Sequence, residues 1–370
     1  MSYKFNKTYR VLGLMSGSSM DGLDCGLFDL SLSEKLNLSW SCKYFHTFPF
    51  SSRIRQLINK AILGDEKSII NADLELGKLF SNIVVRIIDD KIDLLASHGQ
   101  TISHVDGHST RQIGNLSFLK KKCNIPLINN FRQADIDVGG NGAPLVPFLD
   151  WILFKQSKLD TITLNLGGIA NLSYIPRSGI RKHVIGFDTG PGMALIDEAA
   201  KMYFSKDMDE NGLIANSGNV NIELLNLLMK EKFILKQPPK STGRDMFGKE
   251  LVNKINDIFP RMKAEDIMRT FSFFTAKSIS INIENFLNID PEKCRLIISG
   301  GGVKHQILMS DISICTKILD IKKSDDFGID SKMKESLLMA VLGLAKMIKF
   351  PANMPSVTGA KKEVILGEIN

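Results

Sequence analysis

Short apolar runs that lead directly into glycine-rich turns recur four times along this chain of 370 residues. The runs begin at Val11, Thr161, Val184 and Leu296, and glycines follow each of them closely. Buried strands are continuous apolar runs, and a glycine after the strand lets the backbone approach a ligand closely. The pattern therefore predicts an α/β protein that binds a phosphorylated ligand at the ends of its strands.

Helical periodicity fills the segments between these strands. Leu79, Ile83 and Ile87 share one apolar stripe, which predicts an amphipathic helix over residues 69–90. Similar spacing predicts helices over residues 193–204, 221–234, 248–259, 264–287 and 331–348, the fourth being a phenylalanine-rich core helix that one break could interrupt. The turn-rich stretch Gly139-Gly-Asn-Gly-Ala-Pro144 predicts a domain boundary near residues 140–150, followed by a new strand pattern.

The composition is that of an ordinary globular protein, with 44% hydrophobic and 24% charged residues. It excludes a disordered or fibrous chain, and the length suggests about two domains. Five widely spaced cysteines without a CxxC motif predict reduced thiols and a cytoplasmic location. The first apolar run is too short for a signal peptide, and no run approaches the ~18 residues of a membrane span, so we expect no membrane partner.

The net charge of +7 (47 basic against 40 acidic residues) points to anionic partners. The lysines are scattered, Lys120-Lys121-Lys122 is the single triple, and basic residues are not interleaved with aromatic ones. This distribution favours small anionic molecules over nucleic acid, which remains the weaker alternative.

Standard nucleotide motifs do not account for the glycine loops. GxGxxG is absent, and the stretch from Gly243 to Glu250 resembles a Walker loop but has a carboxylate in place of the hydroxyl and no preceding strand. The stretch Gly17-Ser-Ser-Met-Asp-Gly-Leu-Asp24 lies between two apolar runs and predicts a hairpin whose tip binds phosphate, or alternatively an ordinary hairpin turn. Recurrence of glycines at Gly167-Gly168 and Gly300-Gly301-Gly302 favours phosphate and resembles the actin, hexokinase and Hsp70 plan.

Longer blocks carry a more specific resemblance. They are Leu14-Met-Ser-Gly-Ser-Ser-Met-Asp-Gly-Leu-Asp24, Ser97-His-Gly-Gln-Thr101, Asn130-Phe-Arg132, Gly139-Gly-Asn-Gly-Ala-Pro-Leu-Val-Pro147, Asn165-Leu-Gly-Gly-Ile-Ala-Asn171, Phe187-Asp-Thr-Gly-Pro-Gly192, Ser241-Thr-Gly-Arg-Asp245, Ile298-Ser-Gly-Gly-Gly302 and Pro355-Ser-Val-Thr-Gly-Ala360. In this order they resemble the bacterial anhydro-N-acetylmuramic acid kinase family. Each block alone is too short to identify a family, but together the blocks span almost the whole chain.

The resemblance implies two RNase H-like α/β domains, 1–143 with 349–370 and 144–348, around an interdomain ATP cleft. It implies an enzyme of peptidoglycan recycling that uses ATP, with Mg²⁺, to add water across the 1,6-anhydro bond of anhydro-N-acetylmuramic acid and to phosphorylate O6. The products would be N-acetylmuramic acid 6-phosphate and ADP. A homodimer is the family expectation. Two rivals stay open: a hexose or amino-sugar kinase of the same fold, and a non-enzymatic ATP switch of the actin or Hsp70 type.

The nucleotide-binding residues implied by the resemblance lie in the three glycine loops. They are Gly17, Ser18, Ser19, Met20, Asp21, Gly22, Leu23, Asp24, Gly167, Gly168, Gly300, Gly301 and Gly302. Asp21 or Asp24 is the candidate ligand for a Mg²⁺ ion held largely by ATP. Alternatively, one of these aspartates stabilises the hairpin turn through its own backbone.

Two carboxylates are candidates for catalysis. Asp188 follows the apolar run from Val184 and is the expected base that activates water; the alternative is an aspartate that caps the helix beginning near Met193. Glu335 matches a family glutamate that would hold the sugar or assist the water, and the alternative is a solvated charge on a helix face.

The candidate sugar-binding residues are Arg132, His98 and Gln100, the last two at an expected strand end. Arg132 would bind the lactyl carboxylate or a hydroxyl, or else form a surface pair with Asp135 or Asp137. A metal site at His98, His104 and His108 is disfavoured because Asp106-Gly107 predicts a turn between them.

Three positions depart from the family pattern. Ser18 stands where threonine is usual, Asn141 where glutamine is expected, and Met193 where asparagine usually follows the Asp-Thr-Gly-Pro-Gly motif. The last change removes a polar side chain beside the candidate base, which is expected to weaken its orientation.

Overall fold

The computed structural model describes residues 3–17, 20–87 and 92–370. The chain divides into two compact units: unit 1 comprises Met1–Leu153 and Lys332–Asn370, and unit 2 comprises Phe154–Ser331. The sequence-based limits assigned residues 144–153 and 332–348 to the second domain, whereas their contacts place them in unit 1. The first of these stretches contains helix α5 (Val146–Phe154) except for Phe154, which is the first residue of unit 2. The second contains helix α12 (Met333–Met347).

Unit 1 is built on a sheet with the strand order β12-β6-β4-β1-β2-β3. Strands β1 (Tyr9–Ser16), β2 (Gly22–Leu32) and β3 (Leu38–Pro49) form an antiparallel meander, which confirms the predicted hairpin. Strand β4 (Leu94–Val105) runs parallel to β1, and β6 (Leu127–Asn129) runs parallel to β4. The chain end returns as β12 (Glu368–Ile369) beside β6, and β5 (Ser109–Ile113) pairs with the second half of β4.

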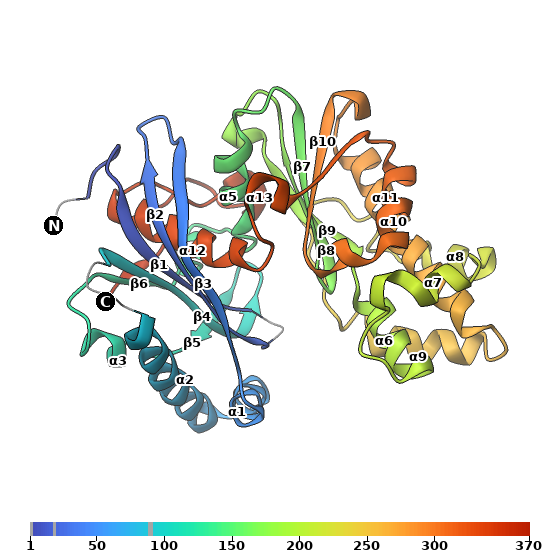
Figure 1. The fold of residues 1–370 in the computed structure, drawn as a ribbon, viewed down its shortest axis with the longest axis horizontal. Coiled ribbons are helices and arrows are strands. Elements are labelled where there is room, and N and C mark those ends of the chain that lie inside the picture. Colours follow the sequence, from blue (N-terminus) through green and yellow to red (C-terminus); the bar gives the residue numbers. More distant parts are fainter. Residues whose placement is uncertain (1–2, 18–19, 88–91) are drawn as a thin grey trace. The chain divides into compact units, whose positions relative to one another are not determined.

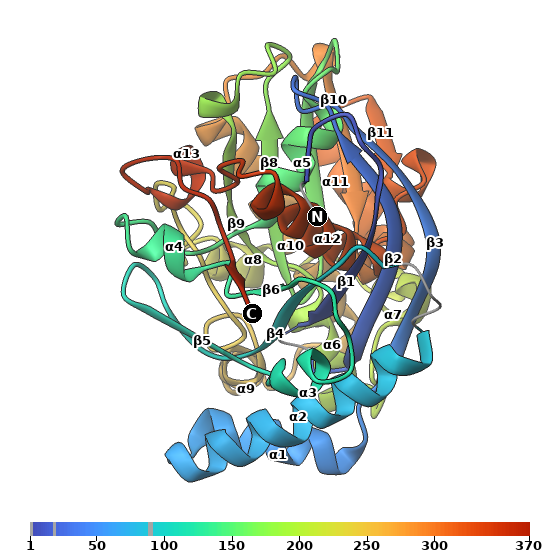
Figure 2. The ribbon, with the colours of Figure 1, turned by 90° about the vertical axis from the view of Figure 1, so that its left-hand side faces the viewer.

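Helices cover both faces of this sheet (Figures 1 and 2). Leu12 and Leu14 of β1 pack into a core with side chains of α1 (Ser52–Leu63) and α2 (Glu66–Ile87). Gly13 faces the other way, because side chains alternate along a strand. A Cβ atom on Gly13 would lie within 3.1 Å of backbone atoms of α12, so this glycine is what allows helix and strand to approach so closely. Shorter helices are α3 (Ser117–Lys120), α4 (Gln133–Ile136) and α13 (Pro355–Thr358).

Unit 2 repeats the strand plan of unit 1. Strands β7 (Asp160–Leu166), β8 (Ile169–Ile175) and β9 (Ile185–Pro191) form an antiparallel meander. Strand β10 (Cys294–Ser299) runs parallel to β7, and β11 (Asp320–Lys323) runs parallel to β10. A three-stranded meander extended by parallel strands is the RNase H-like arrangement, so the expected fold class is confirmed in both units.

The helices of unit 2 largely follow the predicted periodicity. Helix α10 (Ala264–Phe286) is continuous, and α6 (Ala194–Phe204) and α9 (Lys249–Ile258) begin and end near their predicted limits. Helix α8 (Ile222–Leu228) is shorter than predicted because the backbone turns directly after it. Helices α7 (Leu213–Ser217) and α11 (Gln306–Thr316) complete the unit.

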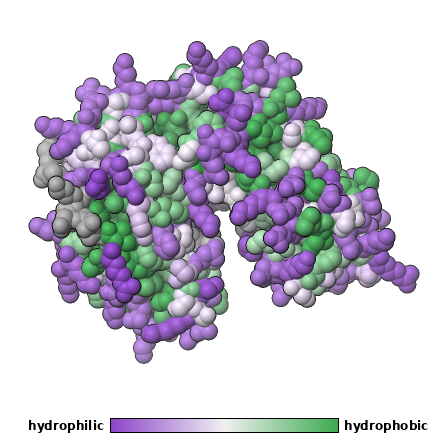
Figure 3. All heavy atoms as spheres, viewed as in Figure 1, coloured by the Kyte–Doolittle hydropathy of each residue, from purple (hydrophilic) through white to green (hydrophobic). Residues whose placement is uncertain are grey.

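The surface is polar in the way the composition suggests. Figure 3 shows hydrophilic side chains over most of the visible face, with hydrophobic side chains in smaller areas between them. Among the described residues, no helix is both long and apolar enough to cross a membrane.

Candidate functional site

Asp188 lies at an irregularity in the edge strand of the second sheet. Asn171 of β8 pairs with Asp188, and the preceding residue, Ala170, pairs with Gly190, so Thr189 is one extra residue on β9. The Thr189 hydroxyl donates to the carbonyl oxygen of Ala170 at 3.1 Å. A bulge of this kind bends a strand and redirects its side chains, and bulges are common beside active sites. Strand β9 continues to Pro191, so the expectation that Asp188 follows the strand is wrong: it lies within the strand, at the bulge.

The segment from Lys240 to Thr242 holds Asp188 on the open edge of β9. The Asp188 N–H donates to the Lys240 carbonyl oxygen at 3.2 Å, and the Thr242 N–H donates to Oδ2 of Asp188 at 2.9 Å. Backbone donors on a carboxylate stabilise its ionised form and fix its direction. The half-buried carboxylate of Asp188 is therefore oriented by main chain.

The Lys240 side chain points into the protein behind this segment. Its Nζ donates to the carbonyl oxygens of Phe233 and Ile234 at 3.1 and 3.0 Å, and Phe187 and Phe286 place their rings within 5.6 Å of it. Burial lowers the pKa of Lys240 to about 8, while the charge of Asp188 opposes that shift. The cation thus lies close enough to influence the candidate base electrostatically.

The alternative role of Asp188 as a helix cap is not seen. Helix α6 has Met193 at its N-cap position, without a side-chain cap bond. The N–H groups of Met193 and Ala194 donate instead to the carbonyl oxygens of Gly167 and Gly168, at 2.8 and 3.0 Å. The turn between β7 and β8 therefore occupies the helix start.

The second glycine loop of unit 2 leaves β10 at the same end of the sheet. Gly300 has φ +91°, and a Cβ atom there would lie 2.6 Å from the Leu166 carbonyl oxygen and 2.7 Å from Oδ1 of Asn165. This position therefore requires glycine. A Cβ atom on Gly301 would have no heavy atom within 4 Å among the described residues, so this part of the loop is open to a ligand.

Arg244 is a functional candidate that the sequence reasoning did not single out. Its guanidinium nitrogens lie 3.2 Å from the position that a Cβ atom of Gly168 would take, and Nη1 lies 3.6 Å from a carboxylate oxygen of Glu198. An arginine beside a glycine turn supplies fork donors for phosphate. The block Ser241-Thr-Gly-Arg-Asp245, which contains Arg244, is the feature of the sequence that could have indicated this residue.

In unit 1, Arg132 is bound to His98. The Nε–H of Arg132 donates to Nε2 of His98 at 3.1 Å, and its Nη1 donates to the Gly142 carbonyl oxygen at 2.8 Å. His98 Nδ1 lies 2.9 Å from the Gly99 carbonyl oxygen, so Nδ1 carries the proton and Nε2 accepts. Burial and the nearby Arg132 charge lower the pKa of His98 to about 3, which keeps the imidazole neutral. His98 thus fixes the direction of Arg132.

The surface-pair alternative for Arg132 does not describe this structure. Asp135 is fully buried and accepts hydrogen bonds from the Gly142 N–H, Nδ2 of Asn353 and the Thr358 hydroxyl, at 2.8–2.9 Å. Asp135 therefore ties the loop that begins at Gly139 to the returning C-terminal segment. Burial lowers the pKa of Arg132 to about 10, with the carboxylate of Glu335 opposing the shift.

Glu335 lies in the first turn of α12 and is half-buried. Burial and the charge of Asp24 raise its pKa, while Arg132 and Lys334 counteract them. The side chain is therefore part of a charged group within unit 1, rather than a fully solvated helix-face charge. Asp24 itself accepts a hydrogen bond from the Thr47 hydroxyl at 2.5 Å.

The N-terminal loop is supported by Gln100. Its Oε1 accepts from the Ser16 hydroxyl at 2.5 Å, and its Nε2 donates to the carbonyl oxygens of Gly17 and Thr101. His98 and Gln100 are not at a strand end as expected, because β4 continues to Val105 by pairing with β5. What ends at Gln100 is the parallel pairing of β4 with β1.

The remaining residues of this loop are placed as follows. Ser18 and Ser19 lie outside the described residues. Met20 has φ +54°, Asp21 is exposed, and Gly22 and Leu23 are buried at the start of β2. His104 lies near Asp106 and Thr110, across the turn that joins β4 and β5. No group of three metal-binding side chains occurs among the described residues.

The family model of anhydro-N-acetylmuramic acid kinase matches residues 9–370. The chain belongs to this family. The anhydro-N-acetylmuramic acid kinase of Clostridioides difficile (strain 630) is 35% identical over 373 residues, covering 97% of each chain. That of Bacillus cereus (strain AH187) is 35% identical over 383 residues, covering 97% of this chain and 98% of the relative.

A solved structure, the activator of the 2-hydroxyisocaproyl-CoA dehydratase from Clostridium difficile with bound ADPNP, matches more remotely. Its identity is 11% and its TM-score 0.42, over 91% of this chain and 95% of that chain, too low to support a conclusion. Membership of the anhydro-N-acetylmuramic acid kinase family makes the chain a phosphotransferase with an alcohol group as acceptor.

Within this kinase family, Met193 is the departure that the structure explains best. A Cβ atom on Gly302 would lie 3.1 Å from the Met193 sulfur, and the side chain packs against both apolar cores of unit 2. Met193 therefore supports the Gly300–Gly302 loop by packing, while the Thr242 N–H orients Asp188.

Proposed function

We propose that the chain opens the 1,6-anhydro ring of anhydro-N-acetylmuramic acid with water and phosphorylates the freed O6. A bond forms between the water oxygen and C1, and the bond between C1 and O6 breaks. O6 then bonds to the γ-phosphorus of ATP, whose bond to the bridging oxygen breaks and releases ADP. The second product is N-acetylmuramic acid 6-phosphate.

Asp188 is the proposed base that takes the proton of the attacking water. The observation that carries this role is its carboxylate, held at a β-bulge by a backbone N–H. Attack at an anomeric carbon with oxocarbenium character needs a carboxylate on the water side. A glycosidase also needs an acid for its leaving oxygen. Here phosphorus captures that oxygen, so one carboxylate suffices.

Unit 1 supplies the proposed groups for the sugar. Arg132, held in one direction by His98, is suited to the lactyl carboxylate or a hydroxyl. Glu335, in its ionised form, would accept from a sugar hydroxyl or from the water. Gln100 has its amide engaged by the loop at Gly17, so we assign it to positioning that loop.

ATP is the proposed phosphoryl donor, bound through the three glycine loops. The residues are Gly17–Asp24 in unit 1, with Ser18 and Ser19 among them, and Gly167, Gly168 and Gly300–Gly302 in unit 2. We add Arg244 as a phosphate donor because of its place beside Gly168. The open backbone at Gly301 and the tightly packed Gly300 support a loop shaped for close approach.

Magnesium would enter with ATP, where it neutralises phosphate charge. Asp24 fits a cation because its half-buried carboxylate adds to the negative potential that raises the pKa of Glu335. Asp21, which is exposed, is the second candidate. We also propose a cytoplasmic location, which the five free cysteines support, and a homodimer, which rests on the family resemblance alone.

Labelled water tests this function directly. Turnover in H₂¹⁸O should place the label at C1 of the product, as read by mass spectrometry of the fragmented sugar. Unlabelled product incubated in the same water for the same time controls for exchange at the hemiacetal. Absence of label at C1 beyond this control would indicate a kinase acting on a free hydroxyl. ATP turnover without stimulation by the sugar would indicate an ATP switch.

A further inference from the structure

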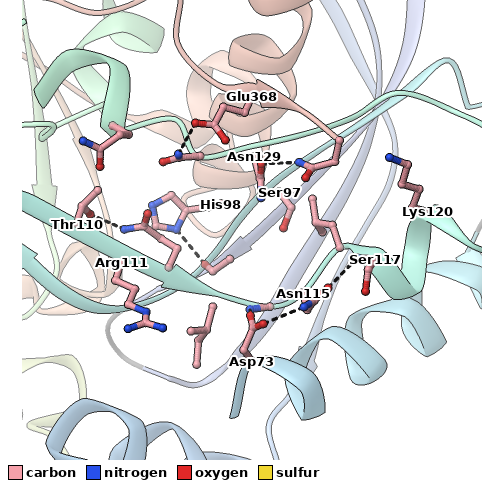
Figure 4. Close-up of a pocket in the computed structure, with 18 residues that line it drawn as sticks. Asp73, Ser97, His98, Thr110, Arg111, Asn115, Ser117, Lys120, Asn129 and Glu368 are labelled. Atoms are coloured by element: carbon pink, nitrogen blue, oxygen red, sulfur yellow. Dashed lines mark hydrogen bonds between the residues drawn. The ribbon is translucent and has the colours of Figure 1, made fainter. Parts of the chain in front are cut away.

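A cavity of about 520 Å³ opens in unit 1 where the first sheet is interrupted (Figure 4). Gln100 of β4 pairs with Ser16 of β1 and with Ile113 of β5, so β5 lies on the edge opposite β1. Strand β6 occupies that same edge but pairs with β4 only as far as Ala96. Between the two partners, no strand of the described residues pairs with the edge of β4 at Ser97–Gly99, and the cavity lies there.

The lining of this cavity is polar and suited to hydroxyl groups. Six carboxamide side chains take part: Gln112, Asn115, Asn129, Asn130, Gln133 and Asn370. Carboxamides both donate and accept, as sugar hydroxyls do. The size is within the usual ~300–1,000 Å³ of small-molecule sites.

One buried polar atom in the wall lacks a partner. The Ser97 side chain is 1% exposed, and its Oγ has no hydrogen-bond partner among the described residues. Buried hydroxyls are almost always hydrogen-bonded, so an orphan at a cavity wall indicates a group that is bound from the cavity. Figure 4 shows Ser97 beside His98 and Asn129 in this wall.

The charged side chains around the cavity differ in their partners. Arg111 is paired with Glu66 at 2.5–2.7 Å, Asp73 accepts from Asn115 and from the Gly114 N–H, and Glu368 accepts from Asn130. Lys120 is exposed at the cavity and has no acidic partner within the described ranges. Lys120 is therefore the lining cation without an acidic partner in these ranges. Asp73 and Glu368 keep their negative charges because their partners are neutral amides, so an anionic group of a ligand is restricted to the neighbourhood of Lys120.

We propose that this cavity binds a monosaccharide-sized, hydroxyl-rich ligand that carries one phosphate or carboxylate group. The carboxamides and Ser97 would bind its hydroxyls, and Lys120 its anionic group. The cavity includes no residue of the glycine loops, although His98, which orients Arg132, is part of its wall. The proposal does not depend on the proposed reaction.

Titration calorimetry on the full chain tests the proposal with four probes: N-acetylglucosamine 6-phosphate, N-acetylmuramic acid, N-acetylglucosamine and inorganic phosphate. Either the phosphorylated or the carboxylated sugar should bind about tenfold more tightly than the neutral sugar and inorganic phosphate. The preferred one of the two identifies the anionic group. Equal binding of the neutral sugar, or of inorganic phosphate, would overturn the proposal. The absence of binding by every probe at a probe concentration of about 10 mM, which is sufficient to detect a weak site, would also overturn it.

Matched variants locate the site. Lys120→Met should weaken binding about tenfold, while Lys121→Met, the same charge change outside the cavity, should leave it unchanged; both should keep the basal activity. Ser97→Ala should weaken binding without lowering the unfolding temperature, because the hydroxyl it removes is unpaired in the free protein. If Lys120→Met and Lys121→Met bind alike, the cavity proposal fails. Loss of binding in Arg132→Lys would then indicate that the ligand occupies the proposed sugar site.

Discussion

The backbone N–H of Thr242 donates to Oδ2 of Asp188 at 2.9 Å, across 54 positions of sequence. The donor is main chain, so the side chain of residue 242 is not needed to hold the carboxylate. The strand that carries Asp188 and the segment that orients it both belong to unit 2. The direction of the candidate base is therefore a property of one folded unit.

Removal of this donor should slow the chemical step. Thr242→Pro lacks the N–H, whereas Thr242→Ala keeps it and loses only the hydroxyl. We expect kcat to fall about tenfold in Thr242→Pro, about 1.4 kcal/mol, with an unchanged KM for ATP. Thr242→Ala should remain close to the parent. Steady-state kinetics on both variants checks this, with thermal unfolding showing that both are folded at the assay temperature. Equal kcat values for the two variants would contradict the role of the hydrogen bond.

Glu335 should set the acid limb of the pH profile. Its pKa is raised above its ordinary 4.5, by burial first and by Asp24 second. If the ionised form binds the sugar or the water, kcat/KM should fall as the pH drops through that raised value. Asp24→Asn removes one repelling charge, so the limb should move to lower pH. In Glu335→Gln, only the limb set by protonation of the proposed base, Asp188, should remain. A limb that stays in place in Asp24→Asn would contradict the coupling.

Gly300 and Gly301 provide neighbouring tests of the proposed nucleotide loop. Gly300→Ala should destabilise the protein by roughly 1–3 kcal/mol, because φ is +91° and the new Cβ would meet the Leu166 carbonyl oxygen. Gly301→Ala has open space and should leave the unfolding temperature unchanged. If this loop contacts ATP, Gly301→Ala should still raise the KM for ATP. An unchanged KM would remove Gly301 from the nucleotide site.

Asp135 should matter for both stability and sugar binding. In Asp135→Asn one oxygen becomes an NH₂ group that faces N–H or O–H donors, which costs roughly 1–3 kcal/mol. The Gly142 loop it holds also accepts from Arg132, so the KM for the sugar should rise. The exposed Asp137→Asn is the control and should behave like the parent. Thermal unfolding measures the effect on stability, and steady-state kinetics measure the KM for the sugar. If both stay at the parent values in Asp135→Asn, this role of Asp135 is contradicted.

The sequence predicted the central strands well because they are buried on both faces and contain short runs of apolar residues. Runs at Val11, Thr161 and Leu296 became β1, β7 and β10, which are central in their sheets. Strand β3 was missed because it lies at a sheet edge and most of its side chains are exposed or half-buried. Helix α12 was predicted from its spacing, but its partner sheet was not, since periodicity does not identify what a helix packs against.

The sequence indicated candidate residues for the site but not the contacts between them. The position of Asp188 was visible in the sequence, but its bulge depends on the register with β8. The bond from Arg132 to His98 spans 34 positions, and the link from Asp135 to Thr358 spans 223. Such pairings arise only when distant segments pack together, so a single sequence could not show them.

Asp188→Asn tests the central claim most directly, because the amide keeps the shape and an acceptor oxygen but cannot take a proton. We predict that kcat falls by about 10²–10⁴-fold, while ATP binding, measured by calorimetry, stays unchanged. Asp257→Asn, an exposed aspartate of the same unit, should match the parent. Activity of Asp188→Asn within about tenfold of the parent would fall below the range for a general base and contradict the account.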